Sequence, residues 1–320
     1  MTPLAAKSPR VAVLSGGVGG AKFAAGLNAM LPAGQLAVIV NTADDFDHLG
    51  LRICPDLDSV LYGLAHLQDE IRGWGRRDES WNCLQALTAI GAEDWFALGD
   101  RDLAVHVFRS HMLRQGMSLA EITEHLVKAL GVQNAIIPMS ESRVSTVLST
   151  DEGELALQDY FVRRRCQPKV QSLRYDGVQQ ARLHPKAKTV LNAPEIQAIF
   201  IAPSNPFLSI DPILALPGVK DMLQNRRVPV IAVSPLIGGR SLKGPLSDML
   251  ESMGFEGSNA TIAKHYSGLI DGMVIDSSDG QDIDGLDLPA LVVPIFMPDA
   301  PSRERLAQAT LEFVQDFSRV

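Results

Sequence analysis

A glycine-rich turn and two acidic clusters near the start of the chain are the residues best suited to chemistry. The turn covers residues 15–22 (SGGVGGAK), and the clusters cover residues 41–45 (NTADD) and 54–59 (CPDLDS). Glycine backbone can close around phosphate oxygens, and carboxylates are good ligands for a hard divalent cation. The pattern predicts a site for phosphate-ester or diphosphate chemistry.

Short apolar runs explain how these residues would be brought together. The clearest runs are residues 11–14, 37–40, 135–137, 198–201, 229–233 and 272–275. Because they are apolar throughout, they predict strands buried on both faces of a mainly parallel sheet in a doubly wound, Rossmann-like α/β fold. In such a sheet, ligands bind beyond the carboxyl ends of the strands. The glycine turn and the loops at 41–45, 203–206 and 234–239 would all lie at that edge.

Two segments depart from the strand-loop-helix alternation. Residues 65–130 have a helical pattern, with Ser118 and Glu121 forming a capping box for a helix that runs to Gly131. Residues from about 144 to 190 alternate polar and apolar side chains and carry the basic run 163–165. We therefore expect an α/β core at 8–64 and 131–320, a helical insertion at 65–130, and a small antiparallel appendage at about 144–190.

Composition excludes several classes of function. The chain has 320 residues, 46% of them apolar and 21% charged, with a formal net charge of -8. This balance is typical of a globular protein and offers no basic surface for nucleic acid or an anionic membrane. Three cysteines without a CxxC pair indicate neither a disulfide framework nor a thiolate zinc site, so we expect a reducing, cytoplasmic location.

Each motif also has a purely structural explanation. Glycines after a first strand often serve only close helix packing, and Asp44 and Asp45, or Asp56 and Asp58, can simply start helices. The turn lacks the third glycine of a dinucleotide fingerprint, and no Ser or Thr follows Lys22 as in a P-loop. These departures argue against classical NAD binding and ATPase activity. Asp58 can still converge with Asp44 on one magnesium ion.

The ordered set of motifs resembles the 2-phospho-L-lactate transferase family of deazaflavin coenzyme biosynthesis. Further motifs recur in that family's order over roughly residues 11–280: GLRICPDLD at 50–58, GWG at 73–75, LGDRD at 98–102, PMS at 138–140, APSNP at 202–206 and VSPLIGG at 233–239. The resemblance implies a magnesium-dependent transferase of coenzyme F-420 biosynthesis. A phosphorylated small acid (2-phospholactate, enolpyruvyl phosphate or 3-phosphoglycerate) would pass from a guanosine diphosphoryl donor to the ribityl hydroxyl of the deazaflavin Fo, releasing GMP.

The resemblance also implies roles for individual residues, and a homodimer. Mg²⁺ would be held by Asp44 and Asp58, and either Asp45 or Asp58 would accept the proton of the attacking alcohol. Residues for the guanosine donor are Gly16, Gly17, Gly19, Gly20, Lys22, Ser204, Asn205, Pro206, Ser234 and Gly238. An Asx or ST turn at Ser204 and Asn205 is the structural alternative for that loop. The acid on the donor is left open.

The Fo site is expected on the helical insertion. The resemblance implies contacts from Asp100 and Arg101, and Trp74 offers a flat face for the ring system. A solvated ion-pair cluster around Arg101 and an ordinary buried tryptophan are the structural alternatives. Glu141 and Val105 replace the Asp and Thr common in the family, so no contact is assigned to either.

Two other classes of function compete with the transferase. A related family of gluconeogenesis-factor type shares the glycine turn and the Asp-Asp loop, and would make this a regulatory protein that binds nucleotide-sugars. The motifs at 54–58 and 98–102 argue against it. A nucleotide-sugar or dinucleotide oxidoreductase is disfavoured by the incomplete glycine fingerprint.

Overall fold

A seven-stranded parallel sheet forms the centre of the computed structural model, which describes residues 10–242 and 244–317. The strand order is β14-β13-β10-β9-β1-β2-β5. Its members are β1 (Val11–Ser15), β2 (Leu36–Val40), β5 (Ala135–Pro138), β9 (Ala198–Ile201), β10 (Val230–Val233), β13 (Gly272–Ile275) and β14 (Ala290–Val292). The six apolar runs are all strands of this sheet, which confirms the α/β fold. The short edge strand β14 was not expected.

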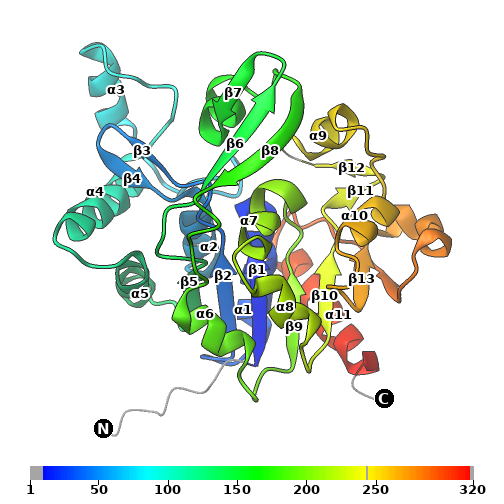
Figure 1. The fold of residues 1–320 in the computed structure, drawn as a ribbon. Coiled ribbons are helices and arrows are strands. Elements are labelled where there is room, and N and C mark those ends of the chain that lie inside the picture. The colour runs from blue at the N-terminus through cyan, green and yellow to red at the C-terminus, as the bar shows by residue number, and fades with distance from the viewer. Residues whose placement is uncertain (1–9, 243, 318–320) are drawn as a thin grey trace, which may run out of the picture.

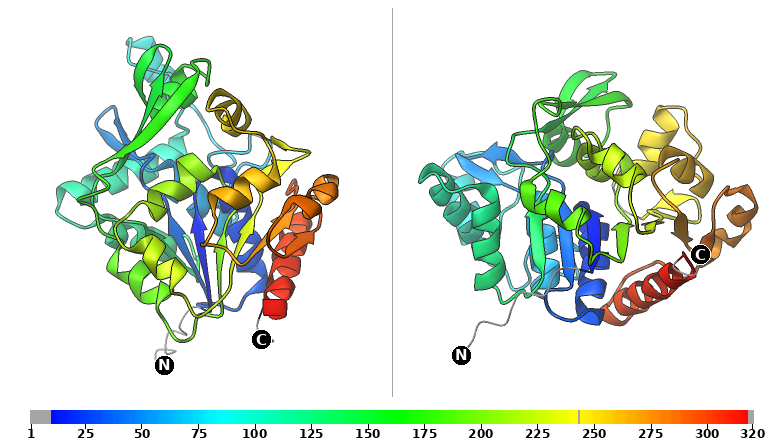
Figure 2. Two further views of the ribbon diagram at one scale, coloured as in Figure 1. Left: turned by 45° about the vertical axis from the view of Figure 1, so that its right-hand side comes forward. Right: turned by 60° about the horizontal axis from the view of Figure 1, so that its bottom comes forward.

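Helices cover both faces of the sheet (Figures 1 and 2). Val11 and Val13 of β1 face one apolar cluster, and the alternate residues Ala12 and Leu14 face the other. The first cluster is completed by α1 (Gly17–Met30), α2 (Pro55–Leu64), α4 (Asp100–Arg114), α5 (Leu119–Ala129) and α11 (Ala300–Phe317). The second is completed by α6 (Pro185–Leu191), α7 (Asp211–Leu214), α8 (Val219–Gln224), α9 (Leu246–Ser252) and α10 (Asn259–His265). Because helices lie on both faces, the strands inside the sheet are buried on both sides.

The two segments that depart from the strand-loop-helix alternation form helices and a small antiparallel sheet. The segment holds α3 (Asn82–Ala89), α4 and α5, and Ser118 caps α5 in a complete capping box with Glu121. The appendage is the antiparallel sheet of β6 (Ser145–Thr150), β7 (Gly153–Ala156) and β8 (Val170–Asp176), with a π-helical turn at Asp159–Arg163. Figure 1 shows this sheet above the carboxyl ends of β1 and β2. Residues 8, 9 and 318–320 of the expected core lie outside the described residues.

Smaller elements complete the edge that carries the candidate residues. Two hairpins are formed by β3 (Phe46–His48) with β4 (Leu51–Ile53) and by β11 (Leu236–Ile237) with β12 (Arg240–Ser241). A π-helical turn covers Pro206–Ile210, and a 3₁₀ segment covers Ser277–Gly285. Within the described residues, no helix is long and apolar enough to cross a bilayer.

Strand order brings the four candidate loops side by side. β1 pairs with both β2 and β9, and β9 pairs with β10, all in parallel. The loops that follow these strands, at 16–17, 41–45, 202–205 and 234–235, therefore meet at one edge. A hydrogen bond of 2.7 Å from Ser204 Oγ to the Gly16 carbonyl oxygen links the first loop to the third.

Candidate active site

The glycine turn brings α1 unusually close to its neighbours. Gly17 has a φ of +63°, which favours glycine. A Cβ on Gly19 would lie 2.3 Å from the Pro203 carbonyl oxygen, and one on Gly20 would lie 2.3 Å from Ser15 Oγ. The close-packing explanation therefore holds for Gly19 and Gly20. It does not exclude a second role, because the N-terminus of a 14-residue helix still faces the sheet edge.

Lys22 is engaged by the chain itself. Its Nζ donates a hydrogen bond of 2.9 Å to the carbonyl oxygen of Met297, in the segment before α11. The structure thus brings the glycines of the turn to the edge and ties the Lys22 ammonium group to a backbone carbonyl. Its expected role in binding phosphate stays a prediction.

Three carboxylates converge on the start of α1. Asp56, in the first turn of α2, accepts hydrogen bonds from the Gly17 backbone N–H at 2.7 Å and from Asn41 Nδ2 at 2.9 Å. Asn41 Nδ2 also donates to the Leu208 carbonyl oxygen at 3.2 Å. Asp44 and Asp45 follow in the same loop, and each has a buried Oδ1 with no hydrogen-bond partner. Buried carboxylate oxygens without partners indicate that something else compensates them.

Burial raises the pKa of each of these carboxyl groups. Desolvation raises the pKa of Asp45 from 3.8 to about 7 and the pKa of Asp56 from 3.8 to about 6. The pKa of Asp44 is also raised, first by burial and then by the charge of Asp56. Crowded acids with raised pKa values are common at functional sites, where a bound cation restores the ionised form.

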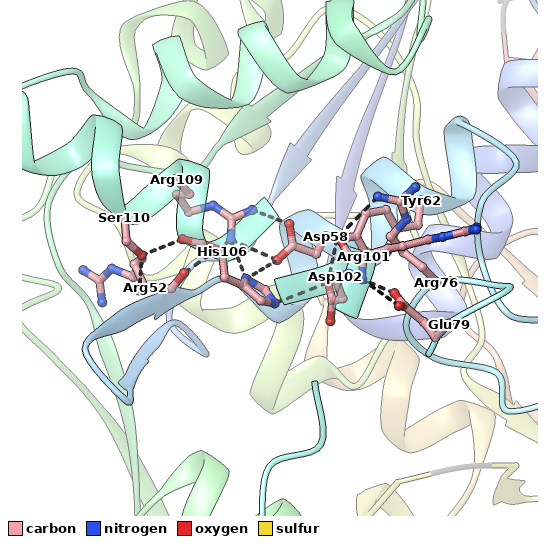
Figure 3. Close-up of polar contacts among 10 residues, drawn as sticks. All are labelled: Arg52, Asp58, Tyr62, Arg76, Glu79, Arg101, Asp102, His106, Arg109 and Ser110. Carbon is pink, nitrogen blue, oxygen red and sulfur yellow. Dashed lines mark hydrogen bonds and ion pairs between the residues drawn. The ribbon is translucent and has the colours of Figure 1, made fainter. Parts of the chain in front are cut away.

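Asp58 has a different partner, as Figure 3 shows. Its carboxylate receives both terminal nitrogens of Arg109 of α4, with Nη1 3.1 Å from Oδ2 and Nη2 in closer contact with Oδ1. The Arg109 side chain is 2% exposed. Burial alone would lower the pKa of Arg109, but the charge of Asp58 raises it above its ordinary value. This is a two-point ion pair inside the protein.

The residues of the loop after β9 make hydrogen bonds within the protein. Asn205 Oδ1 accepts the backbone N–H groups of Phe207 at 3.0 Å and Leu208 at 3.2 Å, which is an Asx-type cap for the turn that begins at Pro206. Its amide Nδ2 lies 3.8 Å from Met249 Sδ of α9. The Ser204 hydroxyl donates its hydrogen bond to the Gly16 carbonyl oxygen. The structural explanation for this loop therefore holds, and its donor-binding role stays a prediction.

Residues of the loop after β10 are also engaged internally. Ser234 is fully buried and donates a hydrogen bond of 2.6 Å to Asn259 Oδ1. The backbone N–H groups of Gly238 and Gly239 each donate to the Asp279 carboxylate at 3.0 Å. The Asp279 carboxylate thus occupies the position at these two amides that an anionic ligand would need.

The expected Fo contacts gather at the start of α4. Asp100 accepts hydrogen bonds from the Ser80 hydroxyl at 2.6 Å and the Cys83 backbone at 3.0 Å, so it fixes the turn before α3. Arg101 is half-exposed, with Nη1 4.0 Å from Asp78 Oδ2. Trp74 is 44% exposed and lies edge-on to Trp81 with ring centroids 6.4 Å apart. Trp74 is therefore not an ordinary buried core residue.

A cavity of about 640 Å³ opens above Asp44 and Asp45. One wall is aromatic, with Phe46 and Trp95 at a centroid distance of 5.9 Å, and another is polar. Further residues of the lining are Arg143, Thr146, Gln158, Asp159, Arg163 and Arg164. The insertion and the appendage thus line a cavity beside Asp44 and Asp45.

Sequence reasoning missed several members of this site. Arg109 lies mid-helix in α4 and carries no motif signal. His106, three residues before it on the same helix face, is a single scattered histidine, which the sequence predicts to be structural. Trp95 precedes the LGDRD motif and was not considered. Asp56 belongs to the acidic cluster at 54–59, and its specific role in the sequence was that of a helix start. Its hydrogen bond from the Gly17 backbone N–H was not foreseen.

The raised pKa values predict how the stability of the metal-free protein depends on pH. Because Asp45 holds its proton up to about pH 7 when folded but only to about 3.8 when unfolded, its contribution is full below pH 4 and lost by about pH 7. The melting temperature of metal-free wild type should fall between pH 5 and pH 8 more than that of Asp45→Asn. Added Mg²⁺ should raise it more at pH 8 than at pH 5, because metal binding needs ionised carboxylates. Identical profiles for the two proteins by calorimetry would refute this assignment.

Comparisons with known proteins agree with one another. A model of the family "2-phospho-L-lactate transferase CofD" matches residues 11–284. The chain is 35% identical over 316 residues to the phosphoenolpyruvate transferase of Streptomyces griseus, covering 96% of this chain and 99% of that protein. It is 37% identical over 324 residues to the phosphoenolpyruvate transferase of Mycolicibacterium smegmatis, covering 95% and 98%.

Solved structures give the fold alone. Protein BH3568 of Bacillus halodurans, described as a member of the UPF0052 family, aligns with a TM-score of 0.64 at 14% identity, over 95% of this chain and all of that one. The family model and the curated relatives span nearly the whole chain and carry the stronger argument. The chain belongs to the 2-phospho-L-lactate transferase CofD family and is an enzyme that transfers a phosphate-containing group.

Proposed function

We propose that this protein moves an enolpyruvyl phosphate group from a guanosine diphosphoryl donor to the terminal ribityl hydroxyl of Fo, with release of GMP. The observation that carries the proposal is the set of buried carboxylates beside the start of α1, where Asp44 and Asp45 each keep an unpaired Oδ1. Relatives named phosphoenolpyruvate transferase favour enolpyruvyl phosphate over phospholactate and phosphoglycerate. A homodimer belongs to the same proposal by family resemblance.

The donor set at the edge fits a magnesium ion. It consists of two carboxylates. Asp44 has a buried Oδ1 without a hydrogen-bond partner, and Asp56, whose charge raises the pKa of Asp44, accepts a hydrogen bond from Asn41. Asp58 already faces Arg109, so we assign the cation to Asp44 and Asp56 in place of Asp44 and Asp58. Bound there, Mg²⁺ would neutralise charge on the diphosphate.

Asp45 and Asp58 suit different tasks toward the acceptor hydroxyl. Asp45 has a free oxygen and a pKa of about 7, raised by burial, which suits proton acceptance near neutral pH. Both oxygens of Asp58 already meet Arg109, so this carboxylate is a fixed hydrogen-bond acceptor. We assign proton acceptance to Asp45 and orientation of the hydroxyl to Asp58.

The reaction can be tested directly with purified protein, Fo and Mg²⁺. We expect GMP and the phosphodiester product to form fastest with the enolpyruvyl donor, when each of the three guanosine diphosphoryl acids is followed by mass spectrometry. Asp44→Asn should lose about a hundredfold or more of this turnover. The exposed Asp287→Asn is the matched control. Absence of GMP release from all three donors would refute the proposed reaction.

The acceptor ring has two candidate platforms. Trp95 lines the same cavity as Asp44 and Asp45, whereas Trp74 and Arg101 do not line it. Arg163 lies over the Trp95 ring at 5.7 Å, which adds a cation beside the aromatic wall. We therefore place the Fo ring against Trp95, with Arg101 and Trp74 as the competing surface.

Binding measurements separate the two platforms. Trp95→Ala should weaken Fo binding by about 1–3 kcal/mol, the order of a lost aromatic contact, and leave GDP affinity unchanged. Trp74→Ala serves as the matched tryptophan control and should bind Fo like the wild type. Fluorescence titration showing the reverse order would move the acceptor to the start of α4.

A further inference from the structure

Arg109 is the largest side chain among the fully buried residues of the described chain, and it is charged. Besides its two contacts with Asp58, its Nη1 lies 3.4 Å from the Arg52 carbonyl oxygen and 3.1 Å from His106 Nδ1. Removing a guanidinium group from water is costly, and a buried ion pair rarely stabilises a fold better than apolar residues of the same volume. The stability of the core therefore does not by itself explain this pair.

The pair continues as a chain of polar contacts along α4 (Figure 3). His106 Nδ1 is 3.6 Å from Asp58 Oδ2, and His106 Nε2 is 3.3 Å from Asp102 Oδ1. The Tyr62 hydroxyl donates to the same Asp102 oxygen at 2.6 Å. Because Arg109 can only donate, Nδ1 of His106 is the acceptor in this contact.

The geometry of the contact distinguishes arginine from lysine. A planar guanidinium group that meets both oxygens of a carboxylate fixes the plane of that carboxylate, whereas an ammonium group fixes only a distance. Asp58 lies in the first turn of α2, two residues after Asp56, so its orientation matters at the candidate active site.

We propose that Arg109 is a positioning residue, which holds the Asp58 carboxylate at the angle needed to orient the acceptor hydroxyl. His106 supports this contact and connects it to Asp102, next to Arg101 at the start of α4. The inference rests on the proposed function, since it assumes that Asp58 meets the acceptor.

Arg109→Lys tests the proposal because it keeps the charge and removes the two-point contact. We expect kcat to fall about tenfold to a hundredfold, as for a misplaced active-site group, with GDP affinity and the KM for the donor unchanged. Arg114→Lys, exposed on the same helix, is the matched control. The double variant with Asp58→Asn should lose no more than the worse single variant, because both changes remove one contact.

Two further measurements keep the test decisive. If Arg109→Lys does not fold, His106→Asn, which keeps an acceptor toward Arg109, should lose less turnover than His106→Leu. A crystal structure of a folded Arg109→Lys should show the Asp58 carboxylate turned from its wild-type plane. The crystal structure separates the positioning role of Arg109 from the proposed function, because the Asp58 carboxylate can turn even if the wild-type protein does not use Fo. The positioning role would be overturned if Arg109→Lys kept the wild-type kcat or left the Asp58 carboxylate in its wild-type plane. It would also be overturned by equal losses of turnover in the two His106 variants, or by a loss of GDP binding in parallel with a lower melting temperature.

Discussion

Compensation of buried negative charge is the constraint on which the arrangement of this site depends. Four carboxylates, those of Asp44, Asp45, Asp56 and Asp58, lie at one edge of the sheet, and three of them are less than a tenth exposed. Ionised carboxylates that close together cannot stay buried without positive charge or hydrogen-bond donors nearby. The protein supplies these unequally: Arg109 matches Asp58, backbone and amide donors serve Asp56, and Asp44 and Asp45 keep unpaired oxygens. The unequal compensation supports the proposed cation site at Asp44.

The fold creates this imbalance through its topology. Parallel pairing of β1, β2 and β9 brings three loops to the same edge, and α2 starts there as well, so its first-turn acids join the loop acids. Gly19 permits the start of α1 to lie close to the Pro203 carbonyl oxygen, on the side of the edge expected to bind the donor. The appendage and Trp95 close the other side and form the cavity over Asp44. Because the chain belongs to a transferase family, the proposed role for these carboxylates is in the transfer of a phosphate-containing group.

Local sequence patterns predicted the fold far better than the contacts within the site. Runs such as Val11–Leu14 are apolar and β-branched, so their burial follows from composition, and the loops after them follow from sheet topology. The short edge strand Ala290–Val292 is only partly buried and gave no comparable signal. Arg109 could not be recognised, because an arginine within a charged helix is usually solvated, and only the tertiary structure turns it toward Asp58. Asn205 and Gly20 show the converse, since the internal contacts that they make are the structural alternatives that the sequence offered, an Asx-type turn and close helix packing.

The central claim is that a divalent cation completes the charge balance at Asp44, while Arg109 completes it at Asp58. Titration of Mn²⁺ by electron paramagnetic resonance, with GDP present, measures this without any turnover. The account predicts that Asp44→Asn loses high-affinity Mn²⁺ binding and that folded Asp58→Asn keeps it. Loss of Mn²⁺ binding in Asp58→Asn equal to that in Asp44→Asn would contradict the account and return Asp58 to the metal.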